Sequence, residues 1–272
     1  MYDMKSFPNC KINIGLNIER KREDGYHDIC TAMYPVPLTD ELEIEEADRF
    51  SFETKGIKLE DDGKENLVVR AYRLMEETYG ILPPVKIRLT KNIPSGAGLG
   101  GGSADAAFTI KMINDMFKIG ATDEEMETIA AKLGADCAFF IKNRPRICKG
   151  KGDLMSDIKI DLKGKRLVMV KPDINISTKE AYTKCSPAPW KNQLEKLLTD
   201  TEVKAWKNEV KNDFEKHIFA NHVELEQIKR EMYEKGASYA SMSGSGSTIY
   251  GIFETKSITS SFTKHKTFII DL

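Results

Sequence analysis

The chain has 272 residues, 40% of them hydrophobic and 31% charged, which is the composition of a globular protein with a substantial core. Its 41 lysine and arginine residues nearly balance 42 aspartate and glutamate residues, giving a formal net charge of −1. The chain therefore lacks the basic excess that is typical of nucleic-acid binding. No apolar run approaches the roughly 20 residues of a membrane-spanning helix. A small molecule is the expected partner, with neither nucleic acid nor membrane.

The cysteines and the N-terminus indicate the compartment. The five cysteines are scattered and odd in number, and no two have Cys-x-x-Cys spacing. This pattern predicts neither a disulfide framework nor a zinc site. The N-terminal residues have no apolar segment of the signal-peptide kind. We therefore expect a protein of the reducing cytoplasm.

The chain begins with segments that have a strand pattern. Apolar residues alternate over 10–18 and predict a strand in which Lys11 and Asn13 project from one face. A charged turn over 20–25 follows and leads through Tyr26-His27 into a second strand.

Further strands and a first helix follow. Residues 42–45 and 50–53 have strand patterns, as has the run 85–89. Asn66 is expected to cap a helix that runs to Tyr79 and ends at the next glycine.

A glycine-rich run over 94–107 is the most informative stretch. Five of the nine residues 94–102 are glycine, and small and apolar residues with helical spacing begin near Ser103. Glycine adopts positive φ, so successive backbone N–H groups can face an anion. The start of a helix adds free N–H groups and the positive end of its dipole. This layout predicts a phosphate-binding loop.

Other interpretations of the glycine run fit less well. A flexible linker would continue into polar low-complexity sequence, whereas this run lies between a strand and an amphipathic helix. No Gly-Lys-Ser/Thr follows, which excludes a Walker A loop. The glycines are too dense for a dinucleotide fingerprint, and the chain has neither His-Arg-Asp nor Asp-Phe-Gly of protein kinases.

The second half of the chain is mainly helical. Residues 122–125 form a capping-box pattern for a helix that ends at Gly134, and Asp136 is expected in the loop after it. A buried strand over 166–170 and mainly helical sequence over 179–235 follow. A glycine-serine loop over 241–247 then leads into a strand over 248–253. These elements predict an α+β protein with two lobes.

Three separated motifs resemble those of the GHMP superfamily of small-molecule kinases, which includes galactokinase, homoserine kinase and mevalonate kinase. They are Pro8-Asn9-Cys10-Lys11-Ile12-Asn13, the glycine run at 94–107 and the loop at 241–247. The resemblance implies the two-lobe GHMP kinase fold, with the active site in the cleft between lobes at 1–160 and 161–272. The first lobe would hold the ATP-binding glycine loop and the catalytic residues.

Four further segments resemble one branch of that superfamily, whose acceptor is a cytidine-diphosphate-linked methylerythritol of the non-mevalonate isoprenoid route. They are Asp24-Gly25-Tyr26-His27, Glu65 to Ala71, Gly134-Ala135-Asp136 with Phe139-Phe140, and Asn212-Asp213-Phe214-Glu215. The resemblance implies transfer of a phosphoryl group from ATP, with Mg²⁺, to the 2-hydroxyl of the acceptor.

The resemblance also implies roles for individual residues. Asp136 would accept the hydroxyl proton, and Lys11 would stabilise charge on the reacting oxygens. Asn13, Tyr26, His27 and Tyr182 would bind the acceptor, with the cytosine stacked between aromatic rings. The residues expected at ATP are Pro94, Ser95, Gly96, Ala97, Gly98, Leu99, Gly100, Gly101, Gly102, Ser103 and Ala104, with Asn66 and Lys91 beside the adenosine. Ser103 is also expected to reach a phosphate or Mg²⁺, and no other metal contact is assigned.

Alternatives for the function remain open from sequence alone. One is another GHMP kinase, of homoserine or mevalonate type. The other is a non-catalytic ligand sensor on the same fold, although such a sensor would not need both Lys11 and Asp136. We expect a monomer or a weak homodimer.

Overall fold

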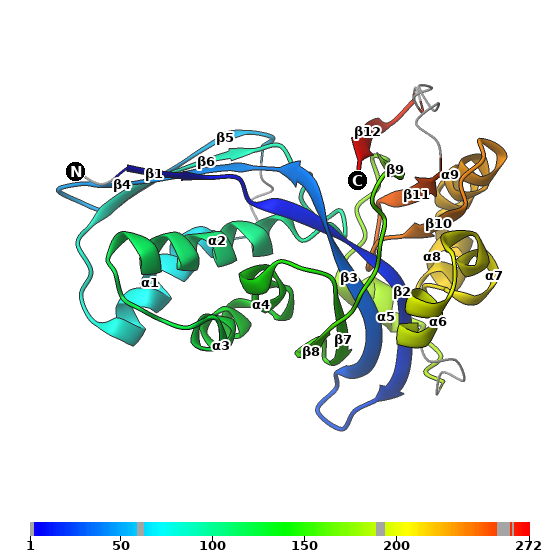
Figure 1. Ribbon diagram of the computed structural model, residues 1–272, viewed down its shortest axis with the longest axis horizontal. Coiled ribbons are helices and arrows are strands. Elements are labelled where there is room, and N and C mark those ends of the chain that lie inside the picture. Colours follow the sequence, from blue (N-terminus) through cyan, green and yellow to red (C-terminus); the bar gives the residue numbers. More distant parts are fainter. Residues whose placement is uncertain (1–2, 59–62, 189–193, 255–261, 263) are drawn as a thin grey trace. The chain divides into compact units, whose positions relative to one another are not determined.

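The computed structural model describes residues 3–58, 63–188, 194–254, 262 and 264–272. The described chain forms three four-stranded sheets together with helices, as the α+β prediction requires (Figure 1). Packing divides it into two compact units that are discontinuous in sequence. One unit contains the residues up to Lys11, Pro37–Ser95 and Gly100–Arg144, and the other contains Ile12–Val36, Gly96–Leu99 and the residues from Pro145 on. No single cut separates these units, and the boundary expected near residue 160 stays a prediction.

The first unit contains a sheet with the strand order β1-β4-β6-β5. Its strands are β1 (Asp3–Ser6), β4 (Glu41–Glu46), β6 (Val85–Lys91) and β5 (Ser51–Gly56). Only β5 and β6 pair in parallel among these strands. Every second residue of β6 is buried, as expected for a strand with one face on the core.

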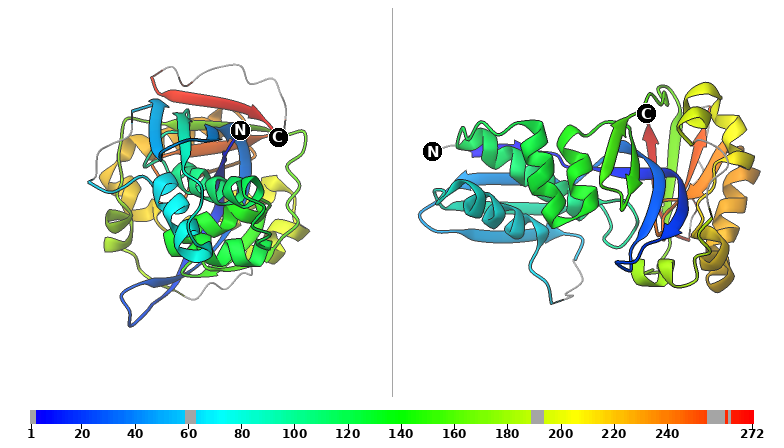
Figure 2. Two further views of the ribbon diagram at one scale, coloured as in Figure 1. Left: turned by 90° about the vertical axis from the view of Figure 1, so that its left-hand side faces the viewer. Right: turned by 90° about the horizontal axis from the view of Figure 1, so that it is seen from below.

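Four helices cover one face of this sheet (Figures 1 and 2). They are α1 (Leu67–Tyr79), α2 (Gly101–Met116), α3 (Asp123–Leu133) and α4 (Ala135–Lys142). Helix α2 lies at the centre, because it packs against β1, β4 and the other three helices. Its buried residues therefore lie on more than one side of the helix.

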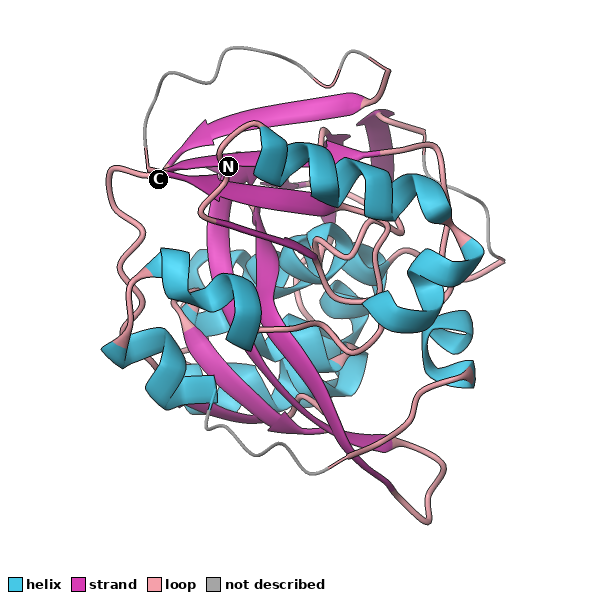
Figure 3. Cartoon of the chain, turned by 90° about the vertical axis from the view of Figure 1, so that its right-hand side faces the viewer, coloured by secondary structure: helices cyan, strands magenta, loops and turns pink. Residues whose placement is uncertain are grey.

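The second unit contains an antiparallel sheet with the order β10-β11-β9-β12. Figure 3 shows the strands of the chain in magenta and its helices in cyan. Its strands are β10 (Tyr239–Met242), β11 (Ile249–Phe253), β9 (Arg166–Lys171) and β12 (Lys266–Asp271). Helix α9 (Val223–Glu234) packs on β10 and β11 through Leu225, Ile228 and Met232. The shorter helical elements are α5 (Thr178–Thr183), α6 (Leu194–Asp200), the 3₁₀ turn η1 (Val203–Ala205), α7 (Trp206–Glu209) and α8 (Glu215–Asn221).

The third sheet has the order β2-β3-β7-β8. Its long strands β2 (Asn9–Lys21) and β3 (His27–Thr39) run side by side in Figure 2, and both contribute residues to the two units. The shorter strands are β7 (Arg146–Gly150) and β8 (Leu154–Asp157). No helix in the described part of the chain is both long and apolar enough to cross a membrane.

Most predicted elements are confirmed, including the Asn66 cap of α1 and the capping box at the start of α3. Helix α2 begins at Gly101, close to the start expected near Ser103. One prediction about a site segment was wrong. Asp136 lies in the first turn of α4 and not in a loop. Residues 137–141 are all buried, so this short helix has no polar face that would reveal it as a helix in the sequence.

Candidate active site

Lys11 and Asp136 form an ion pair within the first unit. The Lys11 ammonium lies 3.4 Å from Oδ2 of Asp136. The lysine side chain is only 3% exposed, whereas the aspartate is 36% exposed. A buried ammonium beside a carboxylate that solvent reaches can stabilise negative charge on that carboxylate and on oxygens bound next to it.

Gly100 makes room for this lysine. A Cβ at Gly100 would lie 3.1 Å from Cε of Lys11 and 3.1 Å from the ring of Phe140. Gly100 also has a φ of +71°, which other residues rarely adopt. The glycine run thus packs directly on the stem of the predicted catalytic lysine.

The start of α2 fits an anion. Gly100 is the N-cap residue and supplies no side chain to the first turn of the helix. Its carbonyl accepts the N–H of Ala104, while the N–H groups of the preceding turn have no partner within the helix. Such free N–H groups bind phosphate, and the helix dipole favours the negative charge.

The three sequence motifs meet at Ser243 in the second unit. The Ser243 hydroxyl donates a hydrogen bond to the carbonyl of Gly98 (2.8 Å) and accepts one from the backbone N–H of Asn13 (3.2 Å). The backbone N–H of Thr248 donates to the carbonyl of Ala97. The glycine-serine loop therefore holds residues 97–98 of the glycine run in place.

The Asn212-Asp213-Phe214-Glu215 segment holds that loop in turn. The side-chain amide of Asn212 donates to the carbonyls of Met242 and Gly244, both at 2.8 Å. The Glu215 carboxylate accepts from the Ser241 hydroxyl (3.0 Å) and from the backbone N–H of Met242 (2.8 Å). Sequence reasoning noted this segment only through resemblance and missed its function as a support.

An aromatic cluster contains two of the predicted substrate-binding residues. The rings of His27 and Tyr182 stack on each other, with centroids 4.8 Å apart and planes 20° apart. Tyr26 is 62% exposed, and the Lys151 ammonium lies 5.2 Å from its ring centroid. Burial, and to a lesser degree the charge of Lys21, lowers the pKa of His27 below its usual value of 6.5. His27 is therefore neutral at pH 7 and can both donate and accept a hydrogen bond.

Asn13 and Asn66 have structural hydrogen bonds. The Asn13 side-chain amide donates to the Thr31 hydroxyl (3.1 Å), and the backbone carbonyl of Asn13 accepts from the Tyr250 hydroxyl (2.8 Å). Asn66 accepts the backbone N–H of Val68 at the start of α1. Contacts of these asparagines with substrate or adenosine stay predictions.

Lys91 is buried between two carboxylates. It is 2% exposed, and its ammonium pairs with Asp40 and Asp105. Burial raises the pKa of Asp105 to about 7, although Lys91 acts in the opposite direction. A direct contact of Lys91 with adenosine stays a prediction.

Ser103 lies in the first turn of α2 beside Cys137. Burial raises the pKa of Cys137 to about 11, even though the Ser103 hydroxyl hydrogen-bonds to its sulfur. In the part of the chain that the structure describes, no three His, Cys, Asp or Glu side chains are placed to hold a metal ion together.

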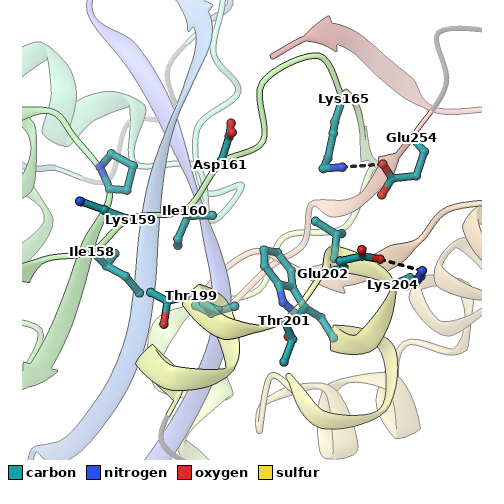
Figure 4. Close-up of a pocket in the computed structure, with 14 residues that line it drawn as sticks. Ile158, Lys159, Ile160, Asp161, Lys165, Thr199, Thr201, Glu202, Lys204 and Glu254 are labelled. Atoms are coloured by element: carbon teal, nitrogen blue, oxygen red, sulfur yellow. Dashed lines mark hydrogen bonds and ion pairs between the residues drawn. The ribbon is translucent and has the colours of Figure 1, made fainter.

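A separate pocket of about 970 Å³ lies in the second unit (Figure 4). Its lining contains none of the predicted site residues. Its lysines at 165 and 204 form ion pairs with Glu254 and Glu202. The pocket is therefore lined by both positive and negative side chains, most of which pair with each other.

Comparisons with known proteins show the family to which the chain belongs. Residues 66–144 match the family model of the GHMP kinases N terminal domain, and residues 177–259 match that of the GHMP kinases C terminal. A mevalonate kinase structure from Methanococcus jannaschii has the same fold, with a TM-score of 0.71 at 14% identity, and the match covers 100% of this chain and 99% of that one. Fold and motifs thus define the class as the GHMP kinases.

Closer relatives narrow the class. The 4-diphosphocytidyl-2-C-methyl-D-erythritol kinase of Bacteroides fragilis is 49% identical over 254 residues, which is 92% of each chain. The protein of the same name from Bacteroides thetaiotaomicron is 46% identical over 255 residues, again 92% of each chain. A crystal structure of 4-(cytidine 5'-diphospho)-2C-methyl-D-erythritol kinase matches with a TM-score of 0.76 at 29% identity, covering 92% of this chain and 90% of that one. The chain belongs to the 4-diphosphocytidyl-2-C-methyl-D-erythritol kinase family.

Proposed function

We propose that the chain transfers the γ-phosphoryl group of ATP to the 2-hydroxyl of 4-diphosphocytidyl-2-C-methyl-D-erythritol, a step of isoprenoid precursor biosynthesis. The observation that carries this proposal is the Lys11–Asp136 pair, with its 3.4 Å separation. Gly100, at the start of α2, packs on the stem of the same lysine.

Asp136 and Lys11 have different roles in the reaction of the acceptor hydroxyl. As the bond from the acceptor oxygen to the γ-phosphorus forms, the hydroxyl proton passes to the Asp136 carboxylate and the bond from the γ-phosphorus to the β–γ bridging oxygen breaks, which releases ADP. The Lys11 ammonium stabilises the negative charge that is shared among the acceptor and phosphoryl oxygens.

The start of α2 serves the phosphates of ATP. Backbone N–H groups at Gly101, Gly102 and Ser103 donate to phosphate oxygens, because no side chain caps this turn. The Ser103 hydroxyl would hold Mg²⁺, which prefers oxygen ligands and keeps several of them from water and substrate phosphates. When bound, that ion would neutralise charge on the phosphates.

Tyr26, His27 and Tyr182 serve the cytidine end of the acceptor. The exposed ring of Tyr26 offers a face on which a base can stack. His27, kept neutral and oriented by its stack on Tyr182, would hydrogen-bond to the polar edge of the cytosine. Tyr182 would contribute through this orientation or by stacking on the base itself.

One assay tests the proposal against its alternatives. ADP release with ATP and Mg²⁺ would be measured for 4-diphosphocytidyl-2-C-methyl-D-erythritol, homoserine and mevalonate side by side. Turnover with the cytidyl compound alone supports the proposal. Turnover with homoserine or mevalonate would support the kinase chemistry but contradict the proposed substrate. No turnover with any of the three would favour a non-catalytic ligand sensor.

A further inference from the structure

Lys91 occupies a core position of its strand. The buried residues of β6 are Val85, Ile87, Leu89 and Lys91, so the lysine continues an otherwise apolar face. An ammonium in such a position is strongly destabilising unless charged partners surround it. The partners of Lys91 must therefore explain why a lysine is tolerated at this position.

Two buried carboxylates from distant elements meet this ammonium. Asp40, between β3 and β4, is fully buried and pairs with Lys91. Asp105, in the second turn of α2, is 2% exposed and lies 2.6 Å from Nζ of Lys91. We refer to Asp40, Lys91 and Asp105 as the buried charge bridge.

Stability alone does not explain the buried charge bridge. Two carboxylates share one ammonium, and Oδ1 of Asp105 has no hydrogen-bond partner among the described residues. Apolar residues of similar size commonly stabilise a core as well as buried ion pairs do, or better. A bridge of this kind is better explained by the geometry that it enforces.

The bridge fixes the surface on which α2 begins. Oδ1 of Asp40 accepts the backbone N–H groups of Asn92 (2.5 Å) and Ile93 (2.9 Å). A Cβ at Gly101 would lie 2.8 Å from the Ile93 side chain and 3.4 Å from Nζ of Lys91. The first residue of α2 is thus seated on a segment that Asp40 holds, while Asp105 ties the next turn to the same lysine.

We propose that Asp40, Lys91 and Asp105 are positioning residues for ATP, because they hold the first turn of α2 where its free N–H groups meet the phosphates. This inference rests on the proposed function, since it takes ATP as the ligand of that turn. The bridge acts through the backbone of α2 and has no part in the proton transfer at Asp136. Its removal should therefore weaken ATP binding selectively.

The test compares Asp105→Leu, Asp105→Asn and Asn114→Ala in steady-state kinetics and thermal unfolding. Asp105→Leu breaks the bridge, and we expect the KM for ATP to rise about tenfold while the KM for the cytidyl acceptor stays within about twofold, since small displacements of a binding group have large effects. Asp105→Asn keeps an oxygen for Lys91, and we expect it to restore most of the ATP affinity. Asn114, which accepts the N–H of Ala121 near the far end of α2, is the matched control: its variant should lower Tm without an ATP-selective change.

Each outcome has one meaning. If Asp105→Leu lowers Tm but leaves the KM for ATP unchanged, or raises both KM values equally, the bridge is only structural and the inference is wrong. If Asp105→Leu does not fold, Asp40→Asn replaces it. Asp40 uses one oxygen for the backbone N–H groups at 92–93 and the other for Lys91, so a single amide oxygen cannot serve both, and the same selective rise in the KM for ATP is expected. A wild-type protein without ATP turnover would instead overturn the proposed function.

Discussion

The carbonyl oxygen of Ser243 occupies the space that a side chain on Gly98 would need. A Cβ at Gly98 would lie only 2.0 Å from that oxygen, and Gly98 also has a φ of +75°. The Ser243 hydroxyl bonds to the Gly98 carbonyl at the same point. The glycine run and the glycine-serine loop are therefore in backbone contact here, and glycine is required at 98 for two separate reasons.

We expect Gly98→Ala to destabilise the protein by clearly more than positive φ alone explains. Gly164 is the matched control, because its φ is +80° and no atom lies within 4 Å of its Cβ position. Gly164→Ala should lower the free energy of unfolding by about 1–2 kcal/mol, the usual penalty for a left-handed residue. Denaturant unfolding of both variants gives the comparison, and equal losses would mean that the Ser243 contact relaxes without penalty.

Asp136→Asn should lower kcat by roughly 10²–10⁴, the usual contribution of a positioned general base. Tm should change little, because the carboxylate is partly exposed. The KM for ATP should also change little, because Asp136 acts on the acceptor hydroxyl and not on the phosphates of ATP. Steady-state kinetics and thermal unfolding measure these three quantities. An unchanged kcat would remove Asp136 from the mechanism.

The affinity for the cytidyl acceptor should depend on pH through His27. The pKa of this histidine is lowered mainly by burial, so it is neutral at pH 7.5 and gains a proton only below pH 6.5. Protonation removes its acceptor nitrogen and should raise the KM for the acceptor as the pH falls below 6.5 and the histidine becomes charged. In His27→Gln, the KM should be higher at pH 7.5 and should lack this pH dependence.

The KM for ATP, measured in the same experiments, is the control. The KM for ATP should respond to pH in the same way in the wild type and in His27→Gln, since neither protonation nor replacement of His27 affects the glycine run. A wild-type KM for the acceptor that stays constant while His27 takes up its proton would contradict a hydrogen bond accepted by His27.

Asn212→Ala should destabilise the second unit by about 2–3 kcal/mol, because it removes three buried hydrogen bonds, two donated to the carbonyls of Met242 and Gly244 and one accepted from the N–H of Phe214. Asn92→Ala is the control, since the Asn92 side chain makes one exposed bond, to the carbonyl of Thr39, and should lose about 1 kcal/mol or less. Denaturant unfolding measures both. Similar losses would mean that the loop at 241–247 is held without Asn212.

Local patterns predicted the elements near the site but not its long-range contacts. Alternation over 10–18 placed Lys11 and Asn13 on one face of a strand, and the strand is present. No local pattern could show that Lys11 meets Asp136 while Asn13 bonds to Thr31. Those partners depend on how distant elements pack, which periodicity does not encode.

The start of α2 lies within the glycine run, and α4 lies in an apolar run, so the sequence pattern does not mark where either helix begins. Gly101 and Gly102 are helical although glycine disfavours helices. A glycine is needed at 101 because Ile93 and Lys91 leave no room for a side chain there. One signal for the buried charge bridge was present in the sequence. Lys91 falls on the apolar positions of the strand pattern around 85–89, and a lysine there requires carboxylate partners.

Cys137, next to the reactive carboxylate in the chain, has a further consequence for handling the protein. Its raised pKa keeps it as a protonated thiol, and burial likewise raises the pKa values of Cys10, Cys30 and Cys185 to about 12, 11 and 11. Thiolates, not thiols, react with alkylating reagents and oxidants. A cysteine introduced at an exposed position should therefore take a maleimide fluorophore in preference to these four and to the fully buried Cys148, so that binding can be followed by fluorescence with the native cysteines in place.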